Sequence, residues 1–312
     1  MSEREPTSVL LPTLEWGPVA AQLAAGLRAE DELLLVCDSA DDPVASHDTP
    51  AGARVLVAGD PDGCSGKANA LARGMEAARH DRLVWTDDDF ERGPDWLDEL
   101  VAAGVCHGPA SAVPFFTGSG WWRLVEPWYG ALFALLVTLQ VGPVADTAWG
   151  GGVTFTREEL TTDVESLAAE LRTVLSDDYL LTQRLPSVHP VRSMVTPVEV
   201  AGDAGAVVSR IVRFGRIVGV NEGWRGSLVN LVVAAVGLAY PFVVAPLLTA
   251  VFVPVYLCVG ERRVNALFAY PGLLLLPVTV LGARLVTEFE WAGRRYRFPE
   301  SGVVEVVRER EG

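Results

Sequence analysis

Lysine is almost missing from this sequence. Lys67 is the single lysine among 25 Lys and Arg residues in a chain of 312, and the formal net charge is −15. The acidic balance excludes the basic face that a nucleic-acid-binding protein needs. A lysine-poor, acidic protein is typical of concentrated salt, where counterions screen self-repulsion. We therefore expect no nucleic-acid partner and a halophilic prokaryotic source.

Paired cysteines and an N-terminal apolar run are missing as well. The chain has no Cys-x-x-Cys motif, so its cysteines predict neither a zinc site nor a disulfide framework and fit a reducing compartment. No apolar segment follows a basic region in residues 1 to 6. We therefore expect no signal peptide and a first domain that stays in the cytoplasm. The four scattered cysteines are Cys37, Cys64, Cys106 and Cys258.

Long uncharged runs, in contrast, are present near the C-terminus. No charged residue occurs from Leu228 to Val259 or from Val264 to Ala283, and these runs explain a mean hydropathy of +0.27. A helix that spans a bilayer needs about 20 apolar residues. The sequence therefore predicts a soluble domain over residues 1–225, a transmembrane region over 226–288 and a charged cytoplasmic tail over 289–312.

The number of spans depends on how the first run breaks. As one helix it would measure about 48 Å, against a hydrocarbon core of about 30 Å. Pro241, Pro246 and Pro254 predict either a span with an interfacial piece or a tight hairpin. Two spans return the arginines that follow the second uncharged run to the cytoplasm, whereas three spans export them. The positive-inside tendency therefore favours two spans, with three as the alternative. These arginines are Arg284, Arg294, Arg295 and Arg297.

A further apolar stretch runs from Trp128 to Ala145 and is nearly long enough to span a membrane. A single crossing there would separate Asp87 to Asp89 from later candidate site residues. We therefore expect a core or interfacial helix, and the aromatic residues at its start, Trp121, Trp122, Trp128 and Tyr129, suit the headgroup region.

In the first half of the chain, continuous apolar segments alternate with helix signals. This alternation predicts a parallel sheet covered on both faces, with a ligand crevice outside the carboxyl ends of its strands. The expected strands cover 8–12, 32–37, 54–57, 83–85 and 112–116, and a glycine-rich turn within 148–156 leads into another strand. The expected helices run from 17 to about 28, from the segment 63–70 to about 78, from about 93 and from the segment 175–181.

Three carboxylates follow one of these strands directly. Asp87, Asp88 and Asp89 come after Leu83-Val84-Trp85-Thr86. Clustered oxygen ligands without His or Cys suit Mg²⁺ or Mn²⁺, and Mg²⁺ is usually held by one or two carboxylates together with substrate phosphates. The segment predicts a metal-bound nucleotide diphosphate, with a solvated turn as the alternative. Asp38 ends another strand and is expected to face the same crevice.

The segment Gly63 to Ala70 resembles a phosphate-binding P-loop only superficially. Pro61 stands where that motif requires its first glycine, and Ala68 stands where it requires Ser or Thr. Lys67 nevertheless lies at a predicted helix N-terminus, where its compact ammonium suits a phosphate or a carboxylate. The alternative is that the one lysine is there by chance.

Two further segments carry candidate site residues. Trp149 precedes three glycines, which either let the backbone approach a ligand closely or form a flexible turn. Asp177 and Asp178 begin a helix for which Ser176 or Asp177 is the natural N-cap, and a cap explains only one of the two aspartates.

Arginines share one helical face just before the long apolar run. Arg210, Arg213 and Arg216 are spaced three residues apart, and Arg225 follows. One interpretation is an anchor for anionic lipid headgroups. The other is that Arg210 and Arg213 bind a diphosphate leaving group.

Together these segments resemble the family 2 glycosyltransferases, within the membrane-bound branch that includes ceramide glucosyltransferases and processive polysaccharide synthases. The resemblance covers roughly residues 8 to 298. Asp38, in Val-Cys-Asp-Ser, looks like the aspartate of the family that contacts the uracil and ribose of the donor. Asp87 and Asp89 resemble its Asp-x-Asp metal site. Asp178, in Ser-Asp-Asp-Tyr, is similar to the catalytic base of its Glu-Asp-Tyr segment.

The arginine segment resembles another motif of the same family. Arg210-x-x-Arg213-Phe214 is similar to the Gln/Arg-x-x-Arg-Trp that closes over the donor diphosphate. Phe214 keeps an aromatic plate but lacks the indole N–H donor of Trp. The segment Trp291-Ala-Gly-Arg-Arg-Tyr296 also looks like the Trp-x-Gly-Arg-x-Tyr that follows the last membrane helix of such enzymes.

The resemblance implies an α/β fold of the GT-A-like nucleotide-diphospho-sugar transferase type, with a mixed sheet, helices on both faces and C-terminal transmembrane helices. It implies an inverting, Mg²⁺- or Mn²⁺-dependent hexosyltransferase in the cell membrane, multi-pass, with the catalytic domain in the cytoplasm. Its donor would be a nucleotide sugar, with UDP favoured over GDP, and its acceptor a membrane lipid, as in glycolipid biosynthesis. The alternatives are a polyprenyl-phosphate or polysaccharide acceptor, and a membrane-anchored nucleotide-sugar binding protein without turnover.

The residue roles that follow are expectations of the resemblance. They are Asp178 as catalytic base; Asp38, Lys67, Asp88, Arg210, Arg213 and Phe214 at the donor; Trp149, Gly150, Gly151 and Asp177 at the acceptor loop; and Asp87 and Asp89 at the metal.

Overall fold

The computed structural model describes residues 5–219, 224–285, 288–291, 293–297 and 305–308. The chain divides into two compact units. Unit 1 comprises Met1–Val113, Ala145–Met194 and Pro299–Val306. Unit 2 comprises Pro114–Val144, Val195–Phe298 and Val307–Gly312.

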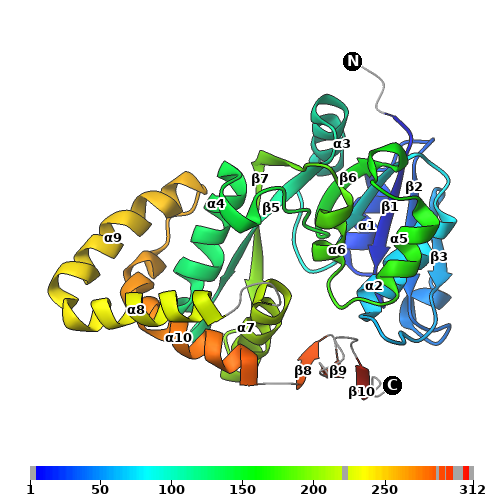
Figure 1. Cartoon of the computed structure of the whole chain (residues 1–312). Coiled ribbons are helices and arrows are strands. Elements are labelled where there is room, and N and C mark those ends of the chain that lie inside the picture. Colours follow the sequence, from blue (N-terminus) through cyan, green and yellow to red (C-terminus); the bar gives the residue numbers. More distant parts are fainter. Residues whose placement is uncertain (1–4, 220–223, 286–287, 292, 298–304, 309–312) are drawn as a thin grey trace. The chain divides into compact units, whose positions relative to one another are not determined.

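A seven-stranded sheet has the strand order β3-β2-β1-β4-β6-β5-β7 (Figure 1). The first four strands are parallel, whereas β6 runs antiparallel to β4 and β5. The mixed sheet is confirmed, and the wholly parallel sheet predicted from the apolar segments is wrong, because burial on both faces does not encode strand direction. The strands are β1 (Thr7–Pro12), β2 (Glu32–Cys37), β3 (Ala53–Val57), β4 (Arg82–Thr86), β5 (Ala110–Gly118), β6 (Gly152–Thr156) and β7 (His189–Val200).

Helices cover both faces of the sheet in unit 1. One face carries Leu10, Trp85 and Phe155, which form a core with α2 (Gly66–Ala77), α5 (Val164–Leu171) and α6 (Asp177–Arg184). The opposite face carries Thr154, against which α3 (Trp96–His107) packs so closely that a Cβ on its Gly104 would lie 2.6 Å from the Thr154 methyl. Alternate side chains of a strand point to opposite faces, so Thr154 and Phe155 define the two layers.

Several boundaries differ from the sequence-based expectations. The first helix, α1 (Pro18–Ala25), ends before the predicted position near 28 because Gly26 caps it. The third helix begins at Trp96, after Gly93-Pro94. The elements without a predicted counterpart include α5 and the 12-residue strand β7. In β7, polar residues interrupt the apolar pattern.

Unit 2 contains the arginine-bearing helix α7 and the apolar C-terminal helices that follow it. These are α7 (Ala204–Gly219), α8 (Trp224–Ala239), α9 (Pro241–Cys258) and α10 (Ala269–Leu285). The long run breaks at Pro241, as one of its three prolines predicted, whereas Pro246 and Pro254 lie inside α9. Within the described residues, α9 is the one helix long and apolar enough to cross a membrane, with a mean hydropathy of 2.1.

Two smaller features complete unit 2. The predicted core or interfacial helix is shorter than expected and consists of a π-helical turn, η3 (Pro127–Leu132), followed by α4 (Phe133–Leu139). A separate small sheet has the order β10-β9-β8, with β8 (Glu288–Trp291) and β9 (Arg294–Arg297) in this unit and β10 at Glu305–Arg308.

Candidate active site

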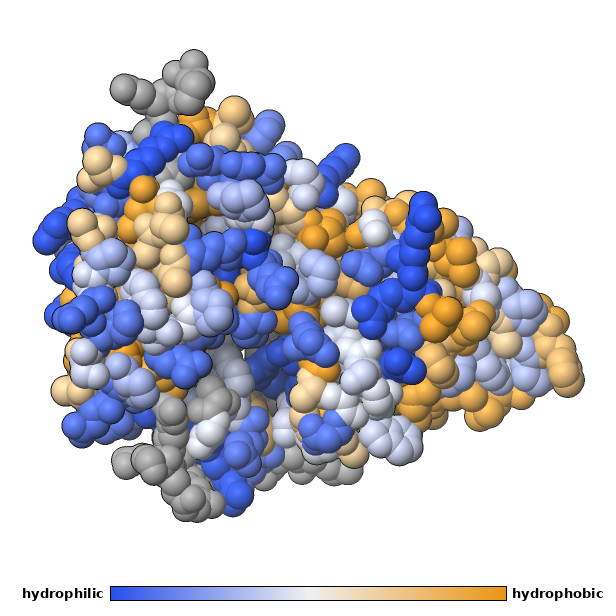
Figure 2. Space-filling model, turned by 180° about the vertical axis from the view of Figure 1, so that it is seen from behind, coloured by the Kyte–Doolittle hydropathy of each residue, from blue (hydrophilic) through white to orange (hydrophobic). Residues whose placement is uncertain are grey.

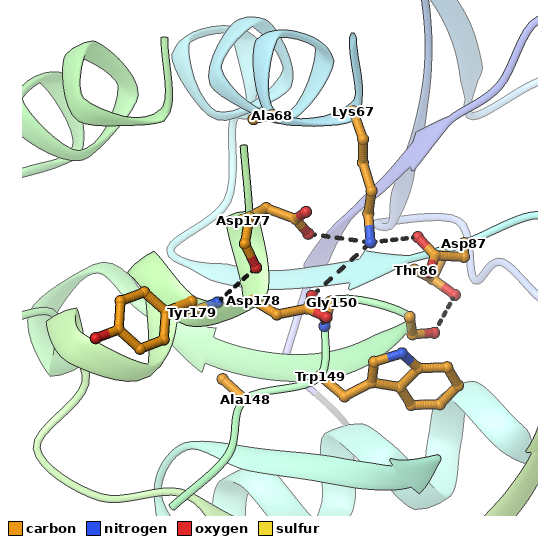
Figure 3. A network of polar contacts seen from close by, with 12 residues as sticks. Lys67, Ala68, Thr86, Asp87, Ala148, Trp149, Gly150, Asp177, Asp178 and Tyr179 are labelled. Atoms are coloured by element: carbon orange, nitrogen blue, oxygen red, sulfur yellow. Dashed lines mark hydrogen bonds and ion pairs between the residues drawn. The ribbon is translucent and has the colours of Figure 1, made fainter. Parts of the chain in front are cut away.

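Polar side chains of unit 1 converge at the edge of the sheet where β4 ends. The N-terminus of α2 supplies Lys67, the residue after β4 is Asp87, and the N-terminus of α6 supplies Asp177 and Asp178. The turn before β6 brings Gly150 to the same place, because β6 runs antiparallel beside β4. Four segments that are distant in sequence therefore form one polar cluster (Figure 3).

Lys67 is the centre of this cluster. Its Nζ lies 2.7 Å from Asp87 Oδ1, 3.0 Å from Asp177 Oδ2 and 3.9 Å from Asp178 Oδ1. Ser65 is the N-cap of α2 and accepts a hydrogen bond from the Ala68 N–H, which starts the helix just before Lys67. One ammonium thus serves three carboxylates, and the cluster keeps a surplus of negative charge.

The absence of a side chain at Gly150 lets its backbone approach Asp178 closely. Its N–H donates a 2.7 Å hydrogen bond to Asp178 Oδ1. A Cβ at this position would lie 2.5 Å from both Asp177 Oδ2 and Asp178 Oδ1, so glycine alone permits this approach. The close approach of backbone is the property expected of the glycine-rich turn.

The two aspartates of α6 differ in exposure although they are adjacent. Ser176 is the N-cap, so the N-cap choice between Ser176 and Asp177 is resolved in favour of the serine. The side chain of Asp177 is 3% exposed, whereas that of Asp178 is 38% exposed. Asp178 is therefore the carboxylate that an incoming ligand can reach.

The charges of the cluster shift each other's protonation. Burial opposes the charged form of Lys67, but Asp177, Asp87 and Asp178 outweigh it and hold the Lys67 pKa well above its usual value. Burial and the neighbouring Asp177 raise the pKa of Asp178 well above that of a free aspartate, against the opposing effect of Lys67. A raised carboxyl pKa brings an aspartate closer to the range of a general base.

The three aspartates after β4 do not point to one place. Asp87 contacts Lys67, and Asp88 Oδ2 accepts a 2.7 Å hydrogen bond from Thr13 Oγ1 at the end of β1. Asp89 is exposed to solvent. The turn they form therefore ties β4 to β1 and presents carboxylates on more than one side.

Arg92 supports this turn and was missed by sequence reasoning. It is 8% exposed, donates to the backbone carbonyls of Asp87 and Phe90 and to Thr86 Oγ1, and lies 3.8 Å from the Phe90 ring centroid. Burial lowers the pKa of Arg92 to about 10, partly offset by the three aspartates. A lone Arg just after Asp-Asp-Asp-Phe-Glu was the available signal, because a nearby cation favours the charged form of clustered carboxylates.

Thr182 and Ser111 are the other supporting residues without a predicted role. Thr182 Oγ1 donates to the Asp178 carbonyl at 2.8 Å and accepts from the Ala148 N–H at 3.0 Å. Ser111 Oγ accepts from the Trp149 N–H at 3.0 Å. These bonds anchor the glycine-rich turn to α6 and β5, so the position of Gly150 is set on both sides.

The donor set around β4 fits a divalent cation that brings ligands of its own. No group of three or more His, Cys, Asp or Glu arranged to hold a metal occurs in the part of the chain that the structure describes. Asp87 uses Oδ1 for Lys67, and Asp89 is exposed. One or two carboxylates with water and substrate phosphates are the usual Mg²⁺ environment, so Asp87 and Asp89 meet the requirement only together with a phosphate ligand.

Asp38 and Trp149 lie at the same edge of unit 1. Asp38 follows β2, is 9% exposed, and has its backbone held by Asp42, whose Oδ2 accepts from the N–H groups of Asp38 and Ser39. Trp149 is 5% exposed and packs 5.1 Å from the Phe90 ring. Trp149 is therefore a buried aromatic ring beside the turn that Asp87 to Asp89 form.

The predicted arginine motif lies in unit 2. The Arg210 guanidinium lies 5.0 Å from the Phe116 ring and 5.8 Å from the Phe214 ring. Phe214 stacks 6.3 Å from Tyr129 at an interplanar angle of 8°. Arg213 lies 4.4 Å from the Trp291 ring. Phe214 thus has an aromatic packing role within unit 2 that needs no indole N–H.

The remaining expectations concern the termini of the apolar region. The Arg213–Trp291 contact joins two of the motifs that carried the family resemblance. Arg294 and Tyr296 are buried in β9, whereas Arg295 and Arg297 are exposed. The side chains of Arg216, Arg225 and Arg284 lie outside the described residues.

Comparison with known proteins yields only distant similarities. No protein-family model matches the sequence, and no curated protein matches it. Among solved structures, glucosyl-3-phosphoglycerate synthase from Mycobacterium tuberculosis in complex with Mn²⁺, UDP-glucose and glycerol 3-phosphate is 19% identical, with 55% of this chain and 69% of that chain covered and a TM-score of 0.35. Its complex with Mn²⁺, UDP and glucosyl-3-phosphoglycerate is 18% identical, with 69% and 80% covered and a TM-score of 0.40.

Proposed function

We propose that this chain is an inverting glycosyltransferase of the family 2 type, which moves a sugar from a nucleotide-diphosphate sugar to a membrane lipid. The observation that carries the proposal is the Lys67 cluster. A reachable carboxylate with a raised pKa, Asp178, lies beside a carboxylate turn suited to a phosphate-bound cation. Such a pair of features is what sugar transfer with a charged leaving group requires.

Asp178 is the proposed base. One of its oxygens accepts from the Gly150 N–H, and the carboxylate is 38% exposed, so it can take a proton from an acceptor hydroxyl. The hydroxyl oxygen then attacks the anomeric carbon while the bond to the donor phosphate breaks. Lys67 and Gly150 fix the orientation of the carboxylate, and Asp177 fixes Lys67.

The leaving nucleoside diphosphate needs positive charge. Mg²⁺ or Mn²⁺, when bound, would neutralise developing negative charge, and Asp87 and Asp89 are the proposed ligands together with the diphosphate. Asp38 is proposed to hold the nucleoside, with Asp88 and Lys67 beside the donor. Arg210 and Arg213 are proposed to bind the diphosphate, with Phe214 as an aromatic plate. UDP is the proposed nucleotide.

The acceptor side follows from the apolar helices of unit 2. We propose that they attach the protein to the cell membrane, with residues 1–225 catalytic and on the cytoplasmic side. The proposed acceptor is a membrane lipid, with Trp149, Gly150 and Gly151 as the proposed acceptor loop. The acidic, lysine-poor composition supports a halophilic source. A polyprenyl phosphate or a growing polysaccharide is the alternative acceptor.

The first experiment measures release of nucleoside diphosphate from a panel of nucleotide sugars. The purified full chain is assayed in high salt with Mg²⁺ or Mn²⁺, with and without lipid extract. We expect release that rises with lipid and stops on chelation of the metal. Asp178→Asn should reduce turnover about a hundredfold or more, the usual contribution of a general base, while donor binding is retained.

A control variant in the same unit distinguishes a loss of catalysis in Asp178→Asn from a loss of folding. Asp163 is the exposed N-cap of α5 in the same unit, and its Oδ1 accepts from the Ser166 N–H at 2.6 Å. Asp163→Asn should keep full turnover. If Asp178→Asn is as active as Asp163→Asn, the assignment of the base is wrong. Donor binding without turnover for every donor and lipid would favour a nucleotide-sugar binding protein.

A further inference from the structure

Unit 2 exposes large apolar side chains along α8 and α9. Phe242 is 94% exposed, Val243 64% and Leu247 59%. No charged residue occurs between Leu228 and Val259. Figure 2 shows apolar residues gathered over this part of the chain. Exposed apolar surface on this scale marks an interaction surface.

The exposed part of α9 has the length of one leaflet. The buried residues of this helix are Phe252, Val255 and Tyr256, all in its second half, where Phe252 packs 5.0 Å from Trp128. The half from Pro241 to Val251 has no buried residue. At 1.5 Å per residue this half is about 16 Å long, close to half of a hydrocarbon core of about 30 Å.

Two carbonyl groups at the break between α8 and α9 accept hydrogen bonds from other groups of the protein. Proline has no N–H, so Pro241 leaves the Gly237 carbonyl without its helical donor. Tyr270 Oη of α10 donates to that carbonyl at 3.3 Å. The Tyr240 carbonyl accepts from the N–H groups of Val243 and Val244 at 3.1 and 2.9 Å. Irregular backbone can lie at hydrocarbon depth only when its polar groups have such partners.

The same break has no charged residue that would favour contact with water on the far side of a membrane. The residues around it are Leu238-Ala239-Tyr240-Pro241-Phe242-Val243, none of them charged. A hairpin that crossed the bilayer would place this loop, with Phe242 94% exposed, in the opposite aqueous phase. That placement would lose the burial free energy of Phe242, the most exposed large apolar side chain among the described residues of the unit.

Headgroup-seeking residues lie at the other end of the hairpin. Trp121 is 61% exposed in η2 (Gly120–Leu124), and Arg123 beside it is exposed. This turn packs against η6 (Val264–Phe268), which follows the exposed Arg262 after α9. Exposed tryptophan and arginine side chains are typical of a membrane interface, and anionic lipid attracts the arginines.

We propose that α8 and α9 form a re-entrant hairpin, which enters the bilayer from one side, places Tyr240, Pro241 and Phe242 near the bilayer centre, and returns without crossing. The occupant of the apolar surface is lipid acyl chain. The inference shares with the proposed function only the presence of a membrane. It needs no sugar transfer, so each can fail while the other stands.

Thiol accessibility tests the topology on the full chain. In a Cys106→Ser, Cys258→Ser background, which keeps the buried Cys37 and Cys64, the protein is added to preformed vesicles of phosphatidylcholine and phosphatidylglycerol. We expect Phe242→Cys to resist an impermeant thiol reagent from outside and from the vesicle lumen, and to react after detergent is added. Val264→Cys, 73% exposed at the base, should react from outside.

The opposite outcomes are equally definite. Reaction of Phe242→Cys from the lumen would show a crossing hairpin, and reaction from outside with vesicles present would show that the tip does not insert. A fluorophore on this cysteine should be quenched more by lipids with a nitroxide near the chain end than by lipids with one near the headgroup. The reverse order would also overturn the proposal.

A charged substitution measures the contribution of the tip. Leu247→Asp should lower partition into the same vesicles about a hundredfold, the factor expected for a carboxylate at hydrocarbon depth. Its control is Val105→Asp, on the exposed face of α3 in unit 1, 52% exposed, which should leave partition unchanged. If Leu247→Asp instead converts a dimer to a monomer and partition is unchanged, a second copy covers this surface and the proposal is wrong.

Discussion

The two units each contain a cluster of polar residues around a carboxylate, and the clusters differ in how their charges are matched. In unit 2, Glu126 is 0% exposed, and its oxygens lie within 3.3 Å of donors from five residues. In unit 1, three carboxylates share the one ammonium of Lys67. The donors to Glu126 are Thr117, the Gly118 N–H, Tyr256, Arg263 and Asn265.

This difference separates a structural cluster from a reactive one. Both carboxylate oxygens of Glu126 are buried and have hydrogen-bond or ion-pair partners within the protein, so they are not available to a ligand. The Lys67 cluster has one positive charge for three carboxylates, and its Asp178 side chain is 38% exposed. A site that binds a cation and a substrate hydroxyl must leave some carboxylate oxygens without partners in the protein. These unmatched carboxylates lower the stability of the folded state.

Removing Lys67 should have the largest effect. Lys67→Met leaves Asp87, Asp177 and Asp178 without their shared cation. We expect loss of turnover and a decrease in the free energy of unfolding of about 2 to 3 kcal/mol, below the range for a fully buried pair because two of the carboxylates reach solvent. Transfer assays and denaturant unfolding measure the two effects.

Lys67→Arg and Arg172→Met are the comparisons for this variant. Arginine keeps the charge but spreads it over a bulkier guanidinium, so Lys67→Arg should lose part of the turnover and less stability. Arg172 pairs with Glu76 at 2.6 Å, both more than a third exposed, and Arg172→Met should cost less than about 1 kcal/mol. Equal effects of Lys67→Met and Arg172→Met would show that the cluster is an ordinary surface network.

Sequence alone anticipated much of unit 1, and for a physical reason. Buried strands read as apolar runs, and the carboxyl ends of parallel strands meet at one edge, so Asp38 and Asp87 could be placed at the same edge of the sheet. The rarity of lysine singled out Lys67, and its partners Asp87 and Asp178 were already candidates. The Ser176 cap was similarly visible, because capping is a local property.

The remainder depends on pairing that is not local. The direction of β6 follows from the path of residues 119 to 151, which no strand pattern encodes. β7 was missed because Arg192, Ser193, Thr196 and Glu199 interrupt its apolar alternation. Glu126 was overlooked although a lone carboxylate between Val125 and Pro127 was a usable signal. Its donors Tyr256 and Asn265 lie at least 130 residues away, so their convergence is visible only in three dimensions.

Disrupting the matched cluster should give the intermediate effect. Glu126→Gln keeps one acceptor oxygen but turns an amide N–H₂ toward donors and leaves Arg263 without its carboxylate partner. We expect unfolding to become easier by about 2 kcal/mol, reduced from the value for a buried ion pair because Arg263 is 33% exposed. Binding of the nucleotide sugar should be unchanged. A selective loss of donor affinity with unchanged unfolding would contradict the structural role.

A matched carboxylate also occurs in unit 1, and it gives the smallest effect. Glu32 is 4% exposed and accepts from Ser8 Oγ at 2.7 Å, the Arg79 N–H at 2.6 Å and Arg54 at 3.1 Å. Burial alone would raise the Glu32 pKa, but Ser8, the Arg79 N–H and Arg54 outweigh it and lower the pKa below its usual value of 4.5. The same unit therefore holds one complete and one incomplete cluster.

The lowered pKa fixes the sign of a pH dependence. Near pH 4.5 the unfolded chain binds a proton at Glu32 that the folded chain does not, so the stability from this group is present above that pH and is lost as the pH falls through the folded pKa. Glu32→Gln should cost about 1 to 2 kcal/mol at pH 7 and lose less stability on acidification than wild type. Denaturant midpoints measured for both proteins from pH 7 downward make the comparison. Parallel pH curves would show that Glu32 is not held charged by its partners, and pairing would then not be what distinguishes it from Asp178.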